Sequence, residues 1–195
     1  MFSLLGVIIL IAALVGACGG TAPEGVEEQV QDVAALEPVP LDSRKRLQVV
    51  ATTNIVGDVV SQVGGDEIAL TTLMETGVDP HSYVPTPAGT AAIHDGHVVF
   101  ANGAGLEADL EEMFESAGGD AVQVYLSQEL EHRASGEGPA EADHDHGPEE
   151  EGLDPHAWFD VQNVIHWAET IEQTLSALDP ANAEAYRANA AAYVE

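Results

Sequence analysis

Residues 47–65, LQVVATTNIVGDVVSQVGG, decide the fold of this chain. The first seven of them are mostly aliphatic and β-branched, which is typical of a buried strand. After residue 53 the apolar side chains recur at helical spacing until a glycine pair stops the helix: Ile55, Val59 and Val63, then Gly64 and Gly65. A strand that runs directly into a helix is a β-α unit, from which parallel sheets are built.

The same alternation continues along the chain. Strand-like runs at 68–74, 97–101 and 121–126 alternate with helical patterns at 86–94 and 106–116. Four strands separated by helices predict an α/β fold, a four-stranded parallel sheet flanked by helices on both faces. In such sheets ligands bind beyond the carboxyl ends of the strands.

A long amphipathic helix is expected after residue 160. Asp160 is placed to cap its amino end, and Trp158 and Phe159 are expected to pack the entry of this helix into the core. Pro180 can start a further helix, which continues to the last residue of the chain. In that helix Tyr186 and Tyr193 have no evident partner, so we expect a following domain to be missing.

Two copies of the tripeptide Asp-Pro-His, at 79–81 and 154–156, are the strongest functional signal. Proline restricts its own backbone and that of the preceding residue, so His81 and His156 each leave a loop in a defined direction. Neutral imidazole suits zinc and other borderline ions. Either histidine alone could be an ordinary loop residue, but the repetition favours two halves of one metal site. Asp79 and Asp154 are candidates either to orient the imidazoles or to cap the turns.

Composition restricts the class of partner. Five basic residues face 34 acidic ones, and the formal net charge is -29. This balance argues against nucleic acid and favours cations, although solubility or a saline habitat would also explain it.

The amino terminus has the pattern of an export signal. Residues 1–18 contain an apolar run that is short for a membrane span and ends in small residues before Cys18, the only cysteine. This resembles a bacterial lipobox, in which the thiol is lipidated, although residues 1–3 lack the usual positive charge. Residues 19–46 are interpreted as a flexible acidic tether.

Residues 129–152 interrupt the α/β rhythm. This stretch holds nine acidic residues and three histidines, His132, His144 and His146. We interpret it as an acidic loop in which His144 and His146 are possible auxiliary metal ligands, with a solvated insertion of no role as the alternative.

Taken in order, three segments resemble the metal-binding lipoproteins of bacterial zinc and manganese ABC transporters, the cluster A-I solute-binding proteins. They are 77–83 (GVDPHSY), 101–107 (ANGAGLE) and 153–160 (LDPHAWFD). The resemblance implies two α/β lobes joined by a long helix, with one metal ion between them. Residues 47–180 would be the amino-terminal lobe, and 181–195 the start of the linking helix, with the carboxy-terminal lobe missing. His81 and His156 match the two ligands of the first lobe.

The resemblance also implies the function. We expect an extracytoplasmic, lipid-anchored, monomeric binding protein, with no enzymatic activity, that delivers its ion to a membrane permease. Zn²⁺ is favoured over Mn²⁺, because manganese prefers more carboxylate and water than imidazole. Three alternatives stay open: a manganese-specific member, an exported zinc hydrolase with Glu107 as base, and a cell-adhesion protein or metal buffer dominated by its acidic segments.

Overall fold

The computed structural model describes residues 33–42, 45–84, 86–107, 110–128, 130 and 154–195. They contain a four-stranded parallel sheet in the order β2-β1-β3-β4. The strands are β1 (Leu47–Thr53), β2 (Ile68–Met74), β3 (Val98–Ala101) and β4 (Val122–Tyr125). The predicted α/β class and the four parallel strands are therefore confirmed.

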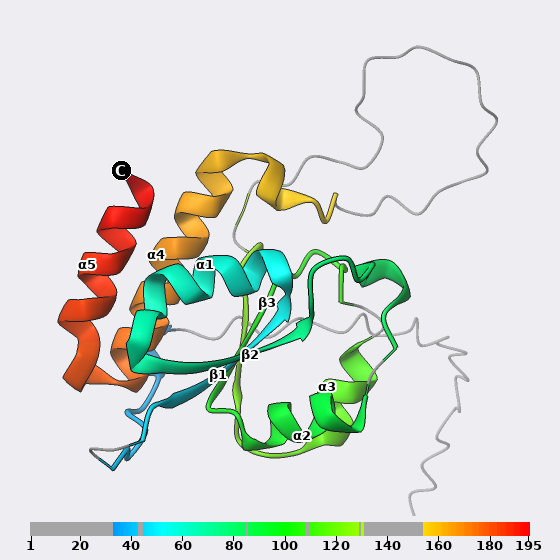
Figure 1. Cartoon of the computed structure of the whole chain (residues 1–195), viewed down its shortest axis with the longest axis horizontal. Helices are drawn as coiled ribbons and strands as arrows, with labels where there is room; N and C mark the ends of the chain where they lie inside the picture. Colours follow the sequence, from blue (N-terminus) through cyan, green and yellow to red (C-terminus); the bar gives the residue numbers. More distant parts are fainter. Residues whose placement is uncertain (1–32, 43–44, 85, 108–109, 129, 131–153) are drawn as a thin grey trace, which may run out of the picture.

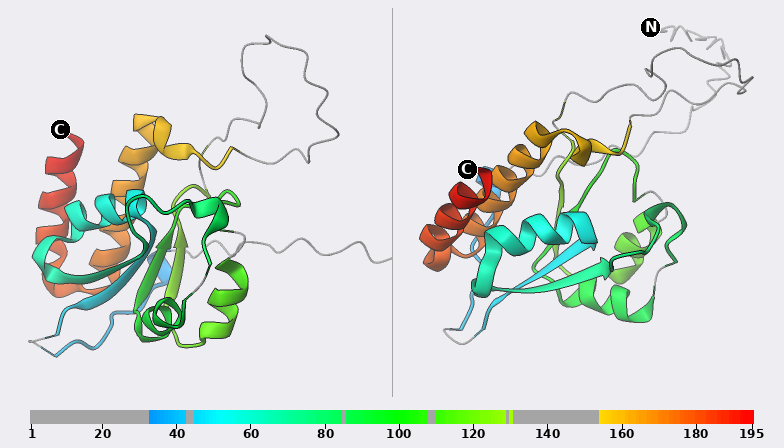
Figure 2. Two further views of the ribbon diagram at one scale, coloured as in Figure 1. Left: turned by 45° about the vertical axis from the view of Figure 1, so that its right-hand side comes forward. Right: turned by 45° about the horizontal axis from the view of Figure 1, so that its top comes forward.

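Helices cover both faces of the sheet (Figures 1 and 2). One face carries α1 (Asn54–Gly64), α4 (Val161–Leu178) and α5 (Ala183–Val194). The other carries α2 (Pro87–Asp95) and α3 (Glu111–Ala117). In the described ranges no helix combines the length and the apolar character that crossing a bilayer would require.

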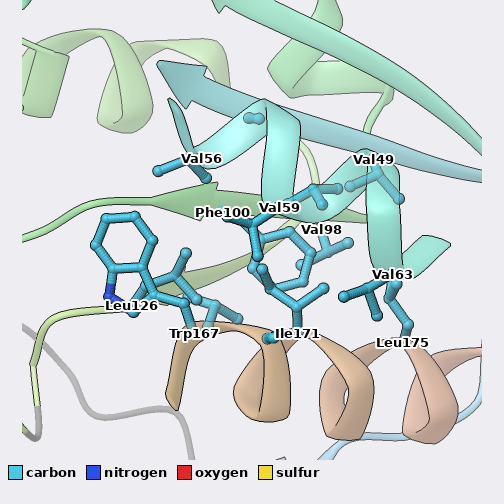
Figure 3. Close-up of a cluster of buried hydrophobic side chains, with 14 of the residues drawn as sticks. Val49, Val56, Val59, Val63, Val98, Phe100, Leu126, Trp167, Ile171 and Leu175 are labelled. Atoms are coloured by element: carbon cyan, nitrogen blue, oxygen red, sulfur yellow. The ribbon is translucent and has the colours of Figure 1, made fainter. Parts of the chain in front are cut away.

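The larger core lies between the sheet and the layer of α1 and α4. Figure 3 shows Trp167, Ile171 and Leu175 of α4 facing the side chains of α1 and of β3. These three side chains are fully buried. A smaller core on the opposite face joins β1 and β3 to α2 and α3. β1 contributes to both cores and is buried along nearly its whole length, as expected for the centre of a parallel sheet.

Side-chain caps fix where three helices begin. The hydroxyl of Thr53 accepts from the backbone N–H of Val56 at the start of α1, and Thr86 does the same for α2. Asp160 Oδ1 accepts from the backbone N–H of Gln162 (2.9 Å), which confirms the predicted cap of α4.

Three expectations about local structure are wrong. The first concerns Phe159, which is 83% exposed rather than packed into the core. It ends the short 3₁₀ turn η5 (Ala157–Phe159), in which only Ala157 is buried, whereas Trp158 is partly buried against the core.

The second concerns the two tyrosines of α5, which were expected to have no partner. Tyr186 is fully buried, and its hydroxyl donates to Asp179 (2.9 Å). Tyr193 is partly buried against the same core.

The third difference concerns α3, which begins at Glu111 and not at residue 106. The segment before it turns through three consecutive residues with positive φ, Gly103, Ala104 and Gly105. The backbone N–H of Leu106 donates to the carbonyl of Gly103 (3.2 Å), so residue 106 still belongs to this turn and not to a helix.

The fold makes a direct prediction for the α4 contact. We expect Ile171→Ala to lower the free energy of unfolding by about 2–5 kcal/mol, because it leaves a cavity where the helix meets the sheet. Gln173→Ala, on the exposed side of the same helix, should stay within about 0.5 kcal/mol of the parent. Urea unfolding followed by tryptophan fluorescence would measure both, and equal effects would contradict the assigned core face.

Candidate metal site

His81 and His156 lie together beyond the carboxyl ends of the strands. His81 belongs to the turn η3 (Pro80–Ser82), which follows β2, and His156 directly precedes η5. The centroids of their rings are 5.7 Å apart, with the ring planes tilted by 55°. Because each zinc–imidazole bond is only about 2 Å long, this separation is compatible with one ion held by both rings. The structure thus brings together the two histidines that the sequence singled out.

The loop of His81 is closed by its own aspartate. Asp79 Oδ1 accepts from the backbone N–H of His81, and Oδ2 accepts from the hydroxyl of Ser82, both at 3.0 Å. Asp79 therefore caps the turn, which is one of the two roles considered for it. The side chain of His81 itself is exposed.

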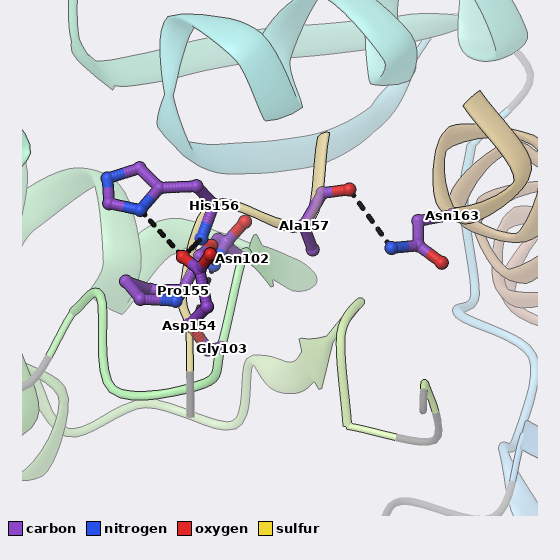
Figure 4. A network of polar contacts seen from close by, with 7 residues as sticks. All are labelled: Asn102, Gly103, Asp154, Pro155, His156, Ala157 and Asn163. Atoms are coloured by element: carbon purple, nitrogen blue, oxygen red, sulfur yellow. Dashed lines mark hydrogen bonds and ion pairs between the residues drawn. The ribbon is translucent and has the colours of Figure 1, made fainter. Parts of the chain in front are cut away.

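Asp154 acts differently on His156. Its Oδ1 accepts from the backbone N–H of His156 (3.0 Å) and from the Nδ1–H of the imidazole (2.8 Å), as Figure 4 shows. A carboxylate at Nδ1 holds the proton on that nitrogen and leaves the lone pair on Nε2 available to an ion. Asp154 therefore both closes the turn and orients the ring.

Apolar side chains surround the two motifs. The ring of His156 meets Trp158 edge to face, with centroids 5.2 Å apart, and Phe159 lies 6.2 Å away. Among the described residues, the large apolar side chains that are exposed all flank the motifs, apart from Val194: Val78, Val84, Phe159 and Val161. We call these four residues the apolar rim. The imidazole of His156 thus lies near two aromatic rings, and the apolar rim beside both motifs is open to solvent.

Glu107 is buried beneath the site and does not face it. It is 4% exposed, and three donors reach its carboxylate: the hydroxyl of Thr52 (2.7 Å) and the backbone N–H groups of Asn102 (2.7 Å) and Gly103 (2.9 Å). Burial raises the pKa of Glu107, while these hydrogen bonds act in the opposite direction. Since both carboxylate oxygens are engaged, Glu107 is poorly placed to serve as the base of a hydrolase.

The other described histidines have local partners or positions. The Nδ1–H of His94 donates to the carbonyl of Ala117 (3.1 Å), and His97 Nδ1 accepts from the backbone N–H of Gln48 (2.9 Å). Burial, and then the charge of Lys45, lower the pKa of His97. His166 is partly buried on α4.

The predicted lipidation site, Cys18, and the possible auxiliary ligands, His144 and His146, lie outside the described residues. In the part of the chain that the structure does describe, no three His, Cys, Asp or Glu side chains group as a metal site would require. The described ligand candidates are therefore the two imidazoles alone.

Comparison with known proteins places this geometry in context. A family model described as zinc-uptake complex component A, periplasmic (ZnuA), matches residues 49–195. The chain is 32% identical over 188 residues to the manganese-binding lipoprotein MntA of Halalkalibacterium halodurans, covering 96% of this chain and 54% of that protein. It is 35% identical over 151 residues to the metal ABC transporter substrate-binding lipoprotein ScbA of Streptococcus cristatus, covering 77% and 47%.

Solved structures give the same picture. A Mn-bound periplasmic metal-binding protein from Candidatus Liberibacter asiaticus superposes with a TM-score of 0.66 at 27% identity, covering 77% of this chain and 52% of that one. Zn(II)-bound AdcA from Streptococcus pneumoniae shares the fold, with a TM-score of 0.64 at 24% identity over 77% of this chain and 30% of that one. The chain spans about half the length of the curated relatives it matches.

The contact between Asp154 and His156 predicts a tautomer. In the metal-free chain we expect the ring of His156 to be protonated at Nδ1, and Asp154→Ala should shift its neutral form toward the Nε2-protonated tautomer. Asp79→Ala is the matched control, because Asp79 bonds to the backbone of its loop and should leave the tautomer of His81 unchanged. Long-range ¹H–¹⁵N NMR spectra of the imidazoles measure this directly; a His156 ring that ignores Asp154→Ala would contradict the assignment.

Proposed function

The chain belongs to the ZnuA family of periplasmic zinc-uptake components, and from this premise we propose that it captures a divalent metal ion for an ABC importer. The observation that carries the proposal is the convergence of His81 and His156, from loops far apart in the sequence, to ring centroids 5.7 Å apart. The relatives are named as metal-binding lipoproteins and substrate-binding lipoproteins, not as enzymes.

The two imidazoles would form half of a ligand set. Zinc prefers four ligands in a closed site, and two neutral nitrogens alone would leave its charge uncompensated. We propose that residues 47–180 act as the first of two lobes, that residues 181–195 begin the link to a second, and that the second lobe supplies the remaining ligands. The apolar rim supports this arrangement, because exposed apolar groups around a polar site favour burial under another body.

We propose zinc as the preferred ion, with manganese as the alternative. Imidazole nitrogen binds zinc more tightly than manganese in the general order of divalent-metal affinities. Several relatives are named for manganese, and one structural neighbour was solved with Zn(II). The chemistry of the two imidazoles supports zinc here, and the ligands from the proposed second lobe would set the final selectivity between the two metals.

The amino-terminal pattern supports a proposal for where the protein lies and where it delivers its ion. We propose that Cys18 is lipidated and that residues 19–46 tether the binding lobe outside the cytoplasmic membrane, next to the permease that receives the ion. The net charge of -29 would raise the local concentration of cations around the lobe. His144 and His146 would add a weaker, auxiliary capture site on the acidic loop.

The first test is titration calorimetry of the purified full-length chain with Zn²⁺ and Mn²⁺. We expect one high-affinity event that is tighter for zinc and that is lost in the His81→Ala, His156→Ala double variant, because the variant removes both imidazoles. The control is His94→Ala, His166→Ala, which removes the same number of imidazoles elsewhere and should bind like the parent. High-affinity zinc binding that survives in the first double variant would overturn the proposal, and tighter binding of manganese would reverse the order of metals.

A second test separates the paired histidines from the acidic loop. Deleting residues 129–152 should leave the high-affinity zinc event unchanged and remove only weaker binding, because the loop lacks the two paired imidazoles. Equilibrium competition against a chelator of known zinc affinity would measure both classes. Loss of the tight event on deletion would favour the metal-buffer alternative.

A further inference from the structure

Asn102, the first residue after β3, connects the sheet to the loop of His156. Its side chain is fully buried, and its Nδ2 group donates to the carbonyl of Gly103 (2.7 Å) and to that of Pro155 (2.9 Å). The bond to Pro155 spans 53 residues of sequence. Figure 4 shows Asn102 and Gly103 lying beside the Asp-Pro-His turn.

This bond acts on the backbone of His156 itself. The carbonyl of Pro155 and the nitrogen of His156 belong to the same peptide group, which is planar and rigid. Asn102 holds the carbonyl side of that plane, and Asp154 Oδ1 accepts from the N–H side (3.0 Å). Together the two bonds set the direction in which the imidazole leaves the backbone.

The orientation of the Asn102 amide is unambiguous. Both groups that face Nδ2 are carbonyl oxygens, which only accept, so the reversed amide would place Oδ1 against two other oxygens. Within the described residues Oδ1 has no hydrogen-bond partner. The Nδ2 group of Asn102 therefore donates two hydrogen bonds to carbonyls, while its buried Oδ1 accepts none from the described residues.

Glu107 fixes the backbone of Asn102 in turn. Its Oε1 accepts from the N–H of Asn102 and from the hydroxyl of Thr52, and its Oε2 accepts from the N–H of Gly103. Thr52 lies in β1, so one carboxylate joins the carboxyl ends of the two central strands. The three donors offset the cost of burying this carboxylate, and an apolar side chain in its place would leave all three without an acceptor. Glu107 therefore keeps the backbone of Asn102 and Gly103 in the conformation from which the Asn102 amide reaches Pro155.

We propose that Asn102 is a positioning residue for His156 and that Glu107 holds Asn102 in place for that role. The inference rests on the proposed metal capture and adds residues that the metal does not touch. It concerns one side of the site only, because the loop of His81 is closed by Asp79 and no described hydrogen bond joins it to Asn102 or Glu107. Loss of such outer partners typically lowers metal affinity about 10–100-fold.

The test compares two substitutions around the same carboxylate. Asn102→Asp keeps the shape of the side chain but replaces the Nδ2 donor with an oxygen, which faces the carbonyl of Pro155. Thr52→Val also keeps shape and removes a hydrogen bond from Glu107, but it leaves both bonds of the Asn102 amide intact. In the full chain, we expect Asn102→Asp to weaken zinc binding about 10–100-fold and Thr52→Val to change it less than about threefold. Circular dichroism at the titration temperature confirms that each variant is folded.

A metal-free readout makes the inference independent of zinc affinity. In NMR spectra without metal, Asn102→Asp should shift the imidazole resonances of His156 and leave those of His81 unchanged. If the parent chain binds no zinc, the proposed function fails, yet this comparison still decides whether Asn102 positions His156.

Three results would overturn the inference. They are zinc affinity of Asn102→Asp within about twofold of the parent, an equal loss in Thr52→Val, or equal shifts of both imidazoles. Should Asn102→Asp not fold, Glu107→Gln replaces it, because its amide can no longer accept from both strand-end N–H groups on separate oxygens. We then expect a smaller loss of zinc affinity with the same restriction to His156; unchanged affinity and unchanged His156 resonances would reject the role.

Discussion

A carboxylate buried at the end of a parallel sheet must be given hydrogen-bond donors, and Glu107 receives three of them. Two come from the backbone where β3 turns away from the sheet, and one comes from β1. The two backbone donors lie at the start of the turn of positive-φ residues that separates β3 from α3. The amide of Asn102 is directed at the loop of His156, so the core and the site share one network.

The two histidine side chains differ in how firmly the surrounding structure holds them. His156 is held by Asp154 at its ring, by Asn102 through its peptide group and by the start of α4 behind it. His81 is exposed, and its hydrogen-bonded support is confined to its own turn. An imidazole that is already oriented loses less conformational freedom on binding an ion. In the proposed metal site His156 would therefore be the preorganised ligand, and the side chain of His81 would have more freedom to adjust to the ion.

The fold could be predicted to the extent that its signals are local. The β-α unit at 47–65, the later alternation and the Asp160 cap each depend on neighbouring residues, and each agrees with the structure. The expectations for Phe159 and Tyr186 were wrong because burial depends on what packs against a side chain. Tyr186 is buried since α5 folds back onto α1, where Asn189 donates to the carbonyl of Val63. Nothing in the alanine-rich sequence of α5 indicates that contact.

The candidate site, like the fold, has features that the local sequence predicts and features that depend on distant contacts. The pairing of His81 and His156 could be anticipated because each follows the same tripeptide, and loops at the carboxyl ends of parallel strands converge. The different roles of Asp79 and Asp154 could not, since in one copy of the tripeptide the aspartate bonds to the backbone and to Ser82, and in the other it also bonds to the histidine ring. The link from Asn102 to Pro155 has no local signal at all. What the repeated motif encodes is the presence of two imidazoles, whereas their unequal rigidity arises from contacts that only the folded chain creates.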